Sequence, residues 1–212
     1  MASAGVVDGA AMITPEQLAR IMPMCRQEWL APLNDAMAEF DINTWVRQAA
    51  FLANVAHESG ECRRVEENLS YSAERLRAVW PGRFPSLEAA RDFERQPEKL
   101  ANYVYGKRLG NSPTEGWKYR GRGLLQLTGK DAFRKCGEAL DLDLVSTPDL
   151  LCVPKHAARS AGWVWRDFKG LNPIADAGGD ANFTRIVRAI NGGTTGLDER
   201  QRYWRKAMEV LR

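Results

Sequence analysis

The sequence predicts a mainly α-helical fold built as one domain over residues 1–212. Apolar residues recur at intervals of three and four in several segments, and residues that favour helix starts precede them. One stretch, residues 119–128, has the alternation typical of a strand or hairpin. A chain of this length buries enough surface to form a stable core without disulfides. We expect residues 1–40 to add a helical extension packed on that core, with no separate binding module.

The first helix is predicted directly after residue 14. Thr14 can cap it, Pro15 suits its first position, and Gln17 can complete a capping box with the threonine. Pro23 and Pro32 follow, and a proline interrupts a helix because it lacks a backbone N–H. The early helices are therefore expected to be short or kinked.

The segment 44–58 has the clearest helical pattern in the chain. Asn43 or Thr44 opens it. Five apolar residues then share one face, which we expect to be buried: Trp45, Ala49, Leu52, Ala53 and Ala56. The helix ends at the Ser-Gly pair that follows, so His57 and Glu58 are expected at the end of a core helix.

The middle of the chain alternates short helices and loops. Ser72 can cap a helix through Val79, and residues 86–104 indicate one or two amphipathic helices. Residues 106–118 contain three glycines, one proline and no periodicity, which predicts a long loop of a kind that often carries function. The glycines within 119–128 indicate close backbone approach in a small hairpin region.

The last third of the chain is predicted to be helical throughout. Proline suits the first turn of a helix, and Pro154 opens the strongest of these segments. The predicted helices cover residues 130–140, 154–168, 180–190 and 197–211. The sequence contains no internal repeat and no low-complexity tract.

Composition excludes several classes of protein. No stretch approaches 18 consecutive apolar residues, so we expect no membrane insertion. The four cysteines form no C-x-x-C pair, which argues against a zinc ribbon and fits reduced thiols. The apolar segment Met1–Met12 has no basic start and is interrupted by Asp8, so we do not expect it to act as a secretion signal.

The net charge of +3 conceals an asymmetry. Residues 1–60 have 3 basic and 7 acidic side chains, whereas residues 61–212 have 27 basic and 20 acidic ones, a net charge of +7. Basic surfaces attract polyanions such as nucleic acid, acidic lipids and acidic cell-wall polymers. The total is too small to indicate nucleic-acid binding, and we expect none. The basic, aromatic segment 200–206 either engages an anionic surface or is a solvated helix face.

A metal or thiol mechanism has little support in the sequence. His57 and Glu58 begin like the zinc-protease motif HExxH, but Glu61 stands where that motif needs its second histidine. The only other histidine is His156, so we expect no metal site. A nucleophilic Cys62 would need a histidine partner, and the side chain of a residue as near in sequence as His57 tends to diverge.

Four carboxylates gather between residues 58 and 67, and they allow two interpretations. They can simply be solvated surface acids: Glu58, Glu61, Glu66 and Glu67. Alternatively, the helix-end position of Glu58 combines partial burial with the negative end of the helix dipole, which suits a proton donor. Glu67 follows nine residues later and can stay solvated across a cleft. Two carboxyls in such different settings are what glycoside cleavage needs.

Two further polar segments are weak signals when taken alone. Gln126 and Thr128 alternate with leucines, so both side chains are expected on one face. Asn191 precedes two glycines and offers an amide at a helix end, although the same residues also make an ordinary helix stop.

Together, four motifs resemble glycoside hydrolase family 19. They are AHESG at 56–60, EENLSYS at 66–72, GWKYRGRGLLQLTG at 116–129 and INGG at 190–193, and they occur in the family order. The resemblance covers residues 40–212 and is greatest to the bacteriophage endolysins, less to the plant chitinases. It implies a lysozyme-like, two-lobed α-helical fold with the hairpin region near the cleft, no cofactor, and an inverting mechanism.

The resemblance also implies roles for individual residues. Glu58 is similar to the general acid of the family, and Glu67 to the general base that activates water. Thr128 is similar to the residue that helps to hold that water. Gln126 and Asn191 fall where the family binds substrate.

Further positions are implied around these five. His57 and Arg122 are expected to contact substrate. Trp117 and Tyr119 are expected either to stack on sugar rings or to pack in the interior. Arg200 is similar to a family arginine that orders the base.

Two departures from the family pattern qualify these assignments. Ala132 stands where the family commonly has asparagine. Because Glu66 and Glu67 are neighbours, either could be the general base. The nine-residue spacing from Glu58 favours Glu67.

The resulting hypothesis is a monomeric, bacteriolytic endolysin of phage or prophage origin. It would hydrolyse the β-1,4 bond between N-acetylmuramic acid and N-acetylglucosamine in bacterial peptidoglycan. It would be stored in the host cytoplasm and would reach the wall through a separate pore. The alternatives are a chitinase, a lytic transglycosylase with one essential glutamate, a glycan-binding or inactive homologue, and a cysteine peptidase.

Overall fold

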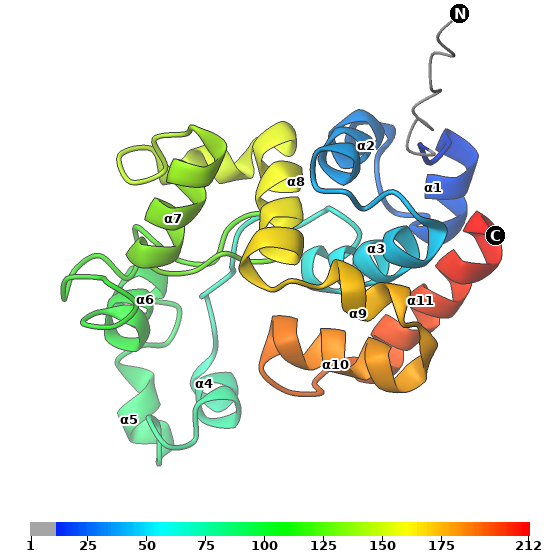
Figure 1. Ribbon diagram of the computed structural model, residues 1–212. Coiled ribbons are helices and arrows are strands. Elements are labelled where there is room, and N and C mark those ends of the chain that lie inside the picture. Colours follow the sequence, from blue (N-terminus) through cyan, green and yellow to red (C-terminus); the bar gives the residue numbers. More distant parts are fainter. Residues whose placement is uncertain (1–11) are drawn as a thin grey trace, which may run out of the picture.

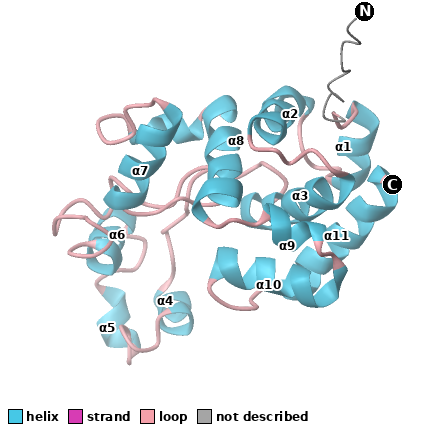
Figure 2. Cartoon of the chain, in the orientation of Figure 1, coloured by secondary structure: helices cyan, strands magenta, loops and turns pink. Residues whose placement is uncertain are grey.

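The computed structural model of the protein describes residues 12–212. Helices dominate this part of the chain, and the mainly α fold class is confirmed (Figures 1 and 2). The expectation that Met1–Met12 is not a secretion signal concerns residues that lie, except for Met12, outside the described range. In chain order, the α-helices are α1 (Pro15–Ile21), α2 (Leu30–Glu39), α3 (Trp45–Ser59), α4 (Ala73–Val79), α5 (Leu87–Arg91), α6 (Pro97–Tyr105), α7 (Lys130–Leu140), α8 (Pro154–Trp163), α9 (Asn172–Asp176), α10 (Gly179–Asn191) and α11 (Leu197–Leu211).

Two separate apolar cores divide the described chain into two lobes. The large core takes side chains from α1–α3, α7, α8, α10 and α11, with α11 packed along α3 and α2 along α8. The small core takes its side chains from residues 69–104, which form α4, α5 and α6. In Figure 1 these three helices lie at the opposite side of the molecule from α1, α3 and α11. The fold is therefore the two-lobed one that the resemblance implied.

The predicted helix starts are present at atomic level. The Thr14 side chain accepts from the Gln17 N–H and the glutamine side chain accepts from the Thr14 N–H, which is a complete capping box. Thr44 caps α3 and Ser72 caps α4, each by a side-chain hydroxyl that accepts from the N–H three residues later. Residues 86–104 form two helices, and 106–118 is a loop.

The predicted helix 154–168 is continuous in direction but changes its hydrogen bonding. α8 ends at Trp163, and Val164–Phe168 continues as a π-helical turn. In that turn the Lys169 N–H donates to the Val164 carbonyl, five residues back. The same spacing stacks Phe168 on Trp163, with ring centroids 5.2 Å apart.

The expected hairpin is reduced to isolated bridges. Arg122 and Leu127 exchange backbone hydrogen bonds of 3.0 and 2.8 Å, but no residue in 12–212 belongs to a regular strand. Gly123 and Gln126 have left-handed φ values of 80° and 54°, so the chain turns where a strand would continue. The prediction of a pairing segment was correct in place, whereas its regular strand geometry was wrong.

Residues 12–40 contribute directly to the large core. Leu18, Leu33 and Met37 are almost fully buried there. The buried Asn34 side chain also bonds both the N–H and the carbonyl of Ile13. This segment is thus packed into the lobe that carries α3.

Candidate active site

Glu58 lies at the end of α3, and a buried arginine holds its carboxylate. Gly60 ends the helix in the left-handed conformation, with a φ of 57°. Arg200 of α11 is 1% exposed and donates to the Glu58 carboxylate and, over 2.8 Å, to Asn54 Oδ1. The expectation that Arg200 orders the base was wrong, because its guanidinium contacts the predicted acid. The packing of α11 along α3 produces this contact.

A sharp turn after α3 brings the chain back toward the cleft. Gly60, Glu61 and Cys62 are all left-handed, which is uncommon for two non-glycine residues in succession. The Glu61 carboxylate stabilises the turn, because it accepts from the Met24 N–H at 2.5 Å and from the Tyr203 hydroxyl at 2.7 Å. Glu61 is therefore structural.

The turn delivers Glu67 to the opposite side of the cleft. Residues 65–67 pair with 121–123, and the Glu67 N–H donates to the Gly121 carbonyl at 2.8 Å. The Glu67 carboxylate accepts from the Gly121 N–H at 3.2 Å and from the Tyr105 hydroxyl at 2.8 Å. Burial and the nearby negative charge of Glu67 raise the pKa of Tyr105, so this hydroxyl keeps its proton.

Glu66 has a different environment from its neighbour. Its carboxylate forms ion pairs with the guanidinium groups of Arg120 and Arg122. Adjacent side chains diverge here, as the sequence argument expected. Of the two glutamates, Glu67 lines the same cavity of about 440 Å³ as Glu58.

This cavity brings five predicted site residues together. It lies at the junction of the lobes, because Glu58 ends a helix of the large lobe and Tyr105 ends α6 of the small lobe. An adjoining opening of about 370 Å³ is lined by Glu58, Glu66 and Glu67 and continues along the small lobe past Tyr71. The larger cavity is lined by Glu58, Glu67, Tyr105, Leu125, Gln126, Thr128, Ile190 and Asn191.

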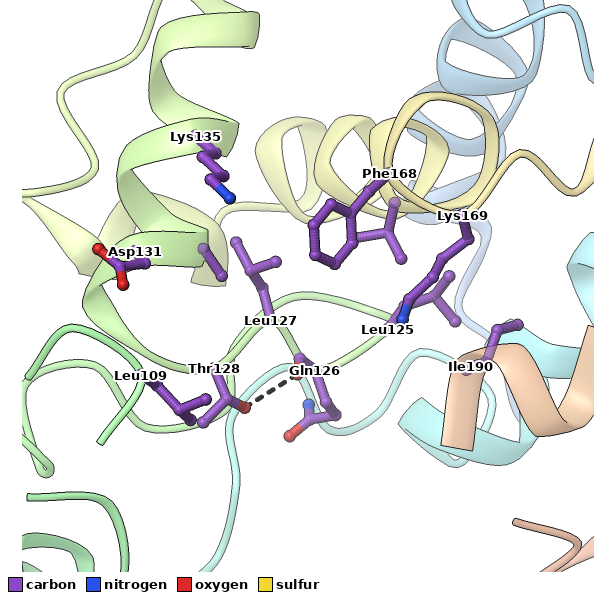
Figure 3. Close-up of a pocket in the computed structure, with 12 residues that line it drawn as sticks. Leu109, Leu125, Gln126, Leu127, Thr128, Asp131, Lys135, Phe168, Lys169 and Ile190 are labelled. Atoms are coloured by element: carbon purple, nitrogen blue, oxygen red, sulfur yellow. Dashed lines mark hydrogen bonds between the residues drawn. The ribbon is translucent and has the colours of Figure 1, made fainter. Parts of the chain in front are cut away.

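Gln126 and Thr128 reach the cavity from the turn rather than from a strand. Gln126 Nε2 donates to the Gly123 carbonyl at 3.0 Å, and the Thr128 hydroxyl donates to the Gln126 carbonyl at 3.0 Å (Figure 3). The intervening Leu127 is buried, as is Leu125. The predicted division into polar and apolar faces was wrong, because the chain turns at the left-handed Gln126 and Leu125 lines the same cavity as Gln126 and Thr128.

The two aromatic candidates do not present free rings to the cavity. Tyr119 is fully buried, and its hydroxyl donates to the Val145 carbonyl at 2.9 Å. Trp117 is half-buried against the small core, and the Arg120 guanidinium lies 3.6 Å from its ring centroid. Packing is therefore the interpretation that holds for Tyr119, whereas sugar stacking by the partly exposed Trp117 stays a prediction.

His57 and Arg122 are not among the residues that line the cavity. The Arg122 side chain is 3% exposed and forms ion pairs with Glu66 and Asp149. His57 Nδ1 lies 2.5 Å from the carboxylate of Glu199. Each side chain is engaged by a carboxylate, and a contact of either residue with substrate stays a prediction.

The structure adds one residue that the sequence gave no reason to choose. Tyr105 is the last residue of α6, and only the folded chain shows that its hydroxyl reaches Glu67. The motif that contains Glu67 is 38 residues away in sequence. A tyrosine at the end of an amphipathic helix carries no local signal of such a contact.

The described residues offer no support for thiol or metal chemistry. Cys62 is buried, and hydrogen bonding with Cys25 together with burial raises the pKa of the Cys62 thiol, which opposes thiolate formation. Between residues 12 and 212, no three His, Cys, Asp or Glu side chains gather as a metal site would require. In the same range no helix has the length and apolarity to span a membrane.

Comparison with known proteins identifies the relatives of this chain. No family model matches it. A glycosyl hydrolase family 19 domain-containing protein of Haemophilus influenzae is 39% identical over 173 residues, which cover 77% of this chain and 79% of the relative. A basic endochitinase of Brassica napus is 34% identical over 97 residues, 42% of this chain but only 34% of the plant protein.

Solved structures share the fold. Chitinase C from Streptomyces griseus has a TM-score of 0.65 at 21% identity, over 98% of this chain and 95% of the other. A bacterial family 19 chitinase gives 0.63 at 24% identity, over 95% of both chains. Together with the Haemophilus relative, these likenesses define the protein as a glycoside hydrolase. The chain belongs to glycosyl hydrolase family 19.

Proposed function

We propose that the protein hydrolyses the β-1,4 bond between N-acetylmuramic acid and N-acetylglucosamine in peptidoglycan, with inversion at the anomeric carbon. The observation that carries this proposal is the shared cavity of Glu58 and Glu67, whose carboxylates have different partners. An inverting glycosidase needs two carboxyls separated widely enough to leave room for a water between base and sugar. The cavity of about 440 Å³ supplies such a space.

Glu58 acts as the general acid and Glu67 as the general base. Protonated Glu58 gives its proton to the glycosidic oxygen as the bond to the anomeric carbon breaks. Ionised Glu67 takes a proton from the water that attacks the opposite face of that carbon. The Thr128 hydroxyl, which lines the same cavity, helps to position this water. Tyr105 and the Gly121 N–H fix the base by donating to its two oxygens.

Arg200 supports proton delivery by Glu58. The acid becomes a carboxylate as it loses its proton, and a fixed guanidinium stabilises that charge more than it stabilises the neutral acid. The contact is therefore stronger in the transition state than in the ground state, and this difference lowers the barrier. Because Arg200 is buried and also bonded to Asn54, it needs no rearrangement during the reaction.

Peptidoglycan is favoured over chitin by charge. Residues 61–212 have a net charge of +7, and the peptides and associated polymers of bacterial walls are acidic, whereas chitin is neutral. Chitin remains the second candidate because the Brassica and Streptomyces relatives are named as chitinases. A lytic transglycosylase would not require a second carboxylate with its own donors.

The catalytic assignment is tested by three single substitutions. Purified wall suspensions should clear at least about 100-fold more slowly with Glu58→Gln or Glu67→Gln, because general acid–base catalysis contributes on this scale. Glu66→Gln is the matched control, since its carboxylate is paired with Arg120 and Arg122. Circular dichroism monitors folding. A folded Glu58→Gln protein that clears walls at the parental rate would refute the mechanism.

Mass spectrometry of digested peptidoglycan tests the bond that is cut. Reducing-end muramic acid is the expected product. Reducing-end glucosamine would indicate a glucosaminidase, and anhydro-muramic ends a transglycosylase, in which case Glu67→Gln should retain most activity. Release of oligosaccharides from chitin alone would favour the chitinase.

We further propose that the protein is an endolysin that reaches the wall from the cytoplasm through a separate pore. Expressed in a bacterial host, it should cause lysis only after the inner membrane is permeabilised, for example by chloroform. The Glu58→Gln variant is the control for lysis by the solvent. Lysis without permeabilisation would refute this route.

A further inference from the structure

A second cavity of about 350 Å³ adjoins the catalytic one (Figure 3). It lies between α7, the π-helical turn after α8 and the end of α10. Four residues line both cavities, so the two are direct neighbours: Leu125, Gln126, Thr128 and Ile190. A substituent on a sugar bound beside Glu58 and Glu67 would therefore lie close to the second cavity.

The floor of this second cavity is apolar and firmly held. Leu125, Leu127 and Val164 line it and are at most 8% exposed. Ala132 adds only a methyl group. Phe168 forms an exposed wall, and its stacking on a tryptophan of α8 keeps the ring in place. A preformed apolar surface of this kind binds small aliphatic groups without a large ordering cost.

The rim of the cavity carries two lysines without carboxylate partners. Figure 3 shows Lys135 extending from α7 and Lys169 extending from the π-helical turn toward the apolar floor. Among the described residues neither lysine forms an ion pair, and the Lys169 ammonium lies 5.1 Å from the centroid of the Phe168 ring. The one acid that lines the cavity, Asp131, is paired with Arg134 at 2.6 Å. The rim therefore presents uncompensated positive charge.

We propose that this cavity binds the acidic peptide that branches from the glycan strand of peptidoglycan. The inference rests on the proposed function and names the part of the substrate that sets specificity. Small aliphatic side chains of the peptide would lie on the floor, and its carboxylates would accept from the ammonium groups of Lys135 and Lys169. Chitin has neither a peptide nor a carboxylate, so it gains nothing from this cavity.

The test compares intact peptidoglycan with the same material after its carboxylates are converted to neutral amides. Amidation leaves the glycan and the peptide length unchanged and removes only the charge. We expect kcat/KM of the parent protein to be about ten-fold higher on the intact material, the effect of two charge-assisted contacts at an exposed rim.

Three variants identify the cavity as the source of that preference. The double variant Lys135→Gln/Lys169→Gln should bring the ratio of kcat/KM on intact to amidated material close to one. Ala132→Leu, which fills the floor, should lower kcat/KM on both materials. Lys155→Gln is the matched control, because Lys155 is an exposed lysine of α8 outside the cavity, and its ratio should equal that of the parent.

The outcomes separate this inference from the proposed function. Equal rates on intact and amidated peptidoglycan would overturn the peptide site and leave the peptidoglycan hydrolase in place. A preference that survives in the double lysine variant would also overturn it. Cleavage of chitin hexamers with no cleavage of either peptidoglycan would instead refute the proposed function.

Discussion

The Tyr105 hydroxyl, at the end of α6 in the small lobe, donates to Glu67 Oε1 over 2.8 Å. Glu67 is attached by a backbone hydrogen bond to residue 121, next to the large core. One side-chain contact therefore joins the lobes at the carboxylate that we assign as the base. A small movement of α6 would therefore change the hydrogen bond to that carboxylate directly.

Tyr105→Phe should slow the reaction without unfolding the protein. It removes one donor from Glu67, so we expect kcat to fall by about ten-fold, the scale of one hydrogen bond to a charged group. Because the pKa of Tyr105 is raised, its ionisation should add no limb to the parental pH–rate profile in the neutral range. Steady-state kinetics of Tyr103→Phe provide the control, since Tyr103 is an exposed residue of the same helix. Equal kcat values for the two variants would contradict the assignment.

Arg200→Ala should destabilise the fold as well as reduce activity. The substitution leaves the carboxylate of Glu58 and the amide of Asn54 without their buried partner. We expect the free energy of unfolding to fall by about 3 kcal/mol, the usual cost of removing one side of a buried ion pair. Urea denaturation measures it, and Arg202→Ala tests an exposed arginine of the same helix. A loss no larger than that of the control would show that the pair contributes little.

The helices were predictable because their signals are local. Thr14, Thr44 and Ser72 cap helices at the positions that their sequence context indicates. The continuous helix 154–168 was predicted with the wrong hydrogen bonding, because the apolar periodicity does not distinguish an α-helical from a π-helical turn at Val164–Phe168.

The site was predictable only as far as the motifs reach. The motif residues Glu58, Glu67, Gln126, Thr128 and Asn191 all line one cavity in the structure. Partners that arise from tertiary packing were missed or misassigned. Arg122 and Tyr119 look like candidate substrate ligands in the sequence, but their polar groups are used inside the fold, and no local pattern distinguishes a buried polar group from an exposed one.

Gly196→Ala should disturb the junction between α10 and α11. Gly196 has a φ of 72°, and a Cβ there would lie 2.3 Å from Cε1 of His57. We expect a loss of about 1–2 kcal/mol from the backbone conformation alone, with a further loss from displacing the histidine. Thermal unfolding measures the effect. Gly193→Ala is the control, because that glycine has no left-handed φ and nothing within 4 Å of the added atom. Equal unfolding temperatures for the two variants would contradict the contact.

The ion pair of Glu115 and Lys130 predicts a pH-dependent contribution to stability. It joins the 106–118 loop to the start of α7, with Nζ and Oε1 2.8 Å apart. The Lys130 ammonium and the Ser112 N–H lower the pKa of Glu115 from 4.5 to about 2. A carboxyl whose pKa is lower in the folded state stabilises the fold above its unfolded pKa, and this contribution is lost as the pH falls toward the folded pKa.

Glu115→Gln should therefore lower the unfolding temperature most above pH 5.5, where the parental carboxyl is ionised in both states. The difference from the parent should shrink steadily as the pH falls from about 4.5 toward 2. Differential scanning calorimetry across this range measures the trend, with Glu98→Gln as the control, because that glutamate is exposed on α6. A difference between parent and Glu115→Gln that stays constant between pH 6 and pH 3 would show that the ion pair does not contribute through the ionisation of Glu115.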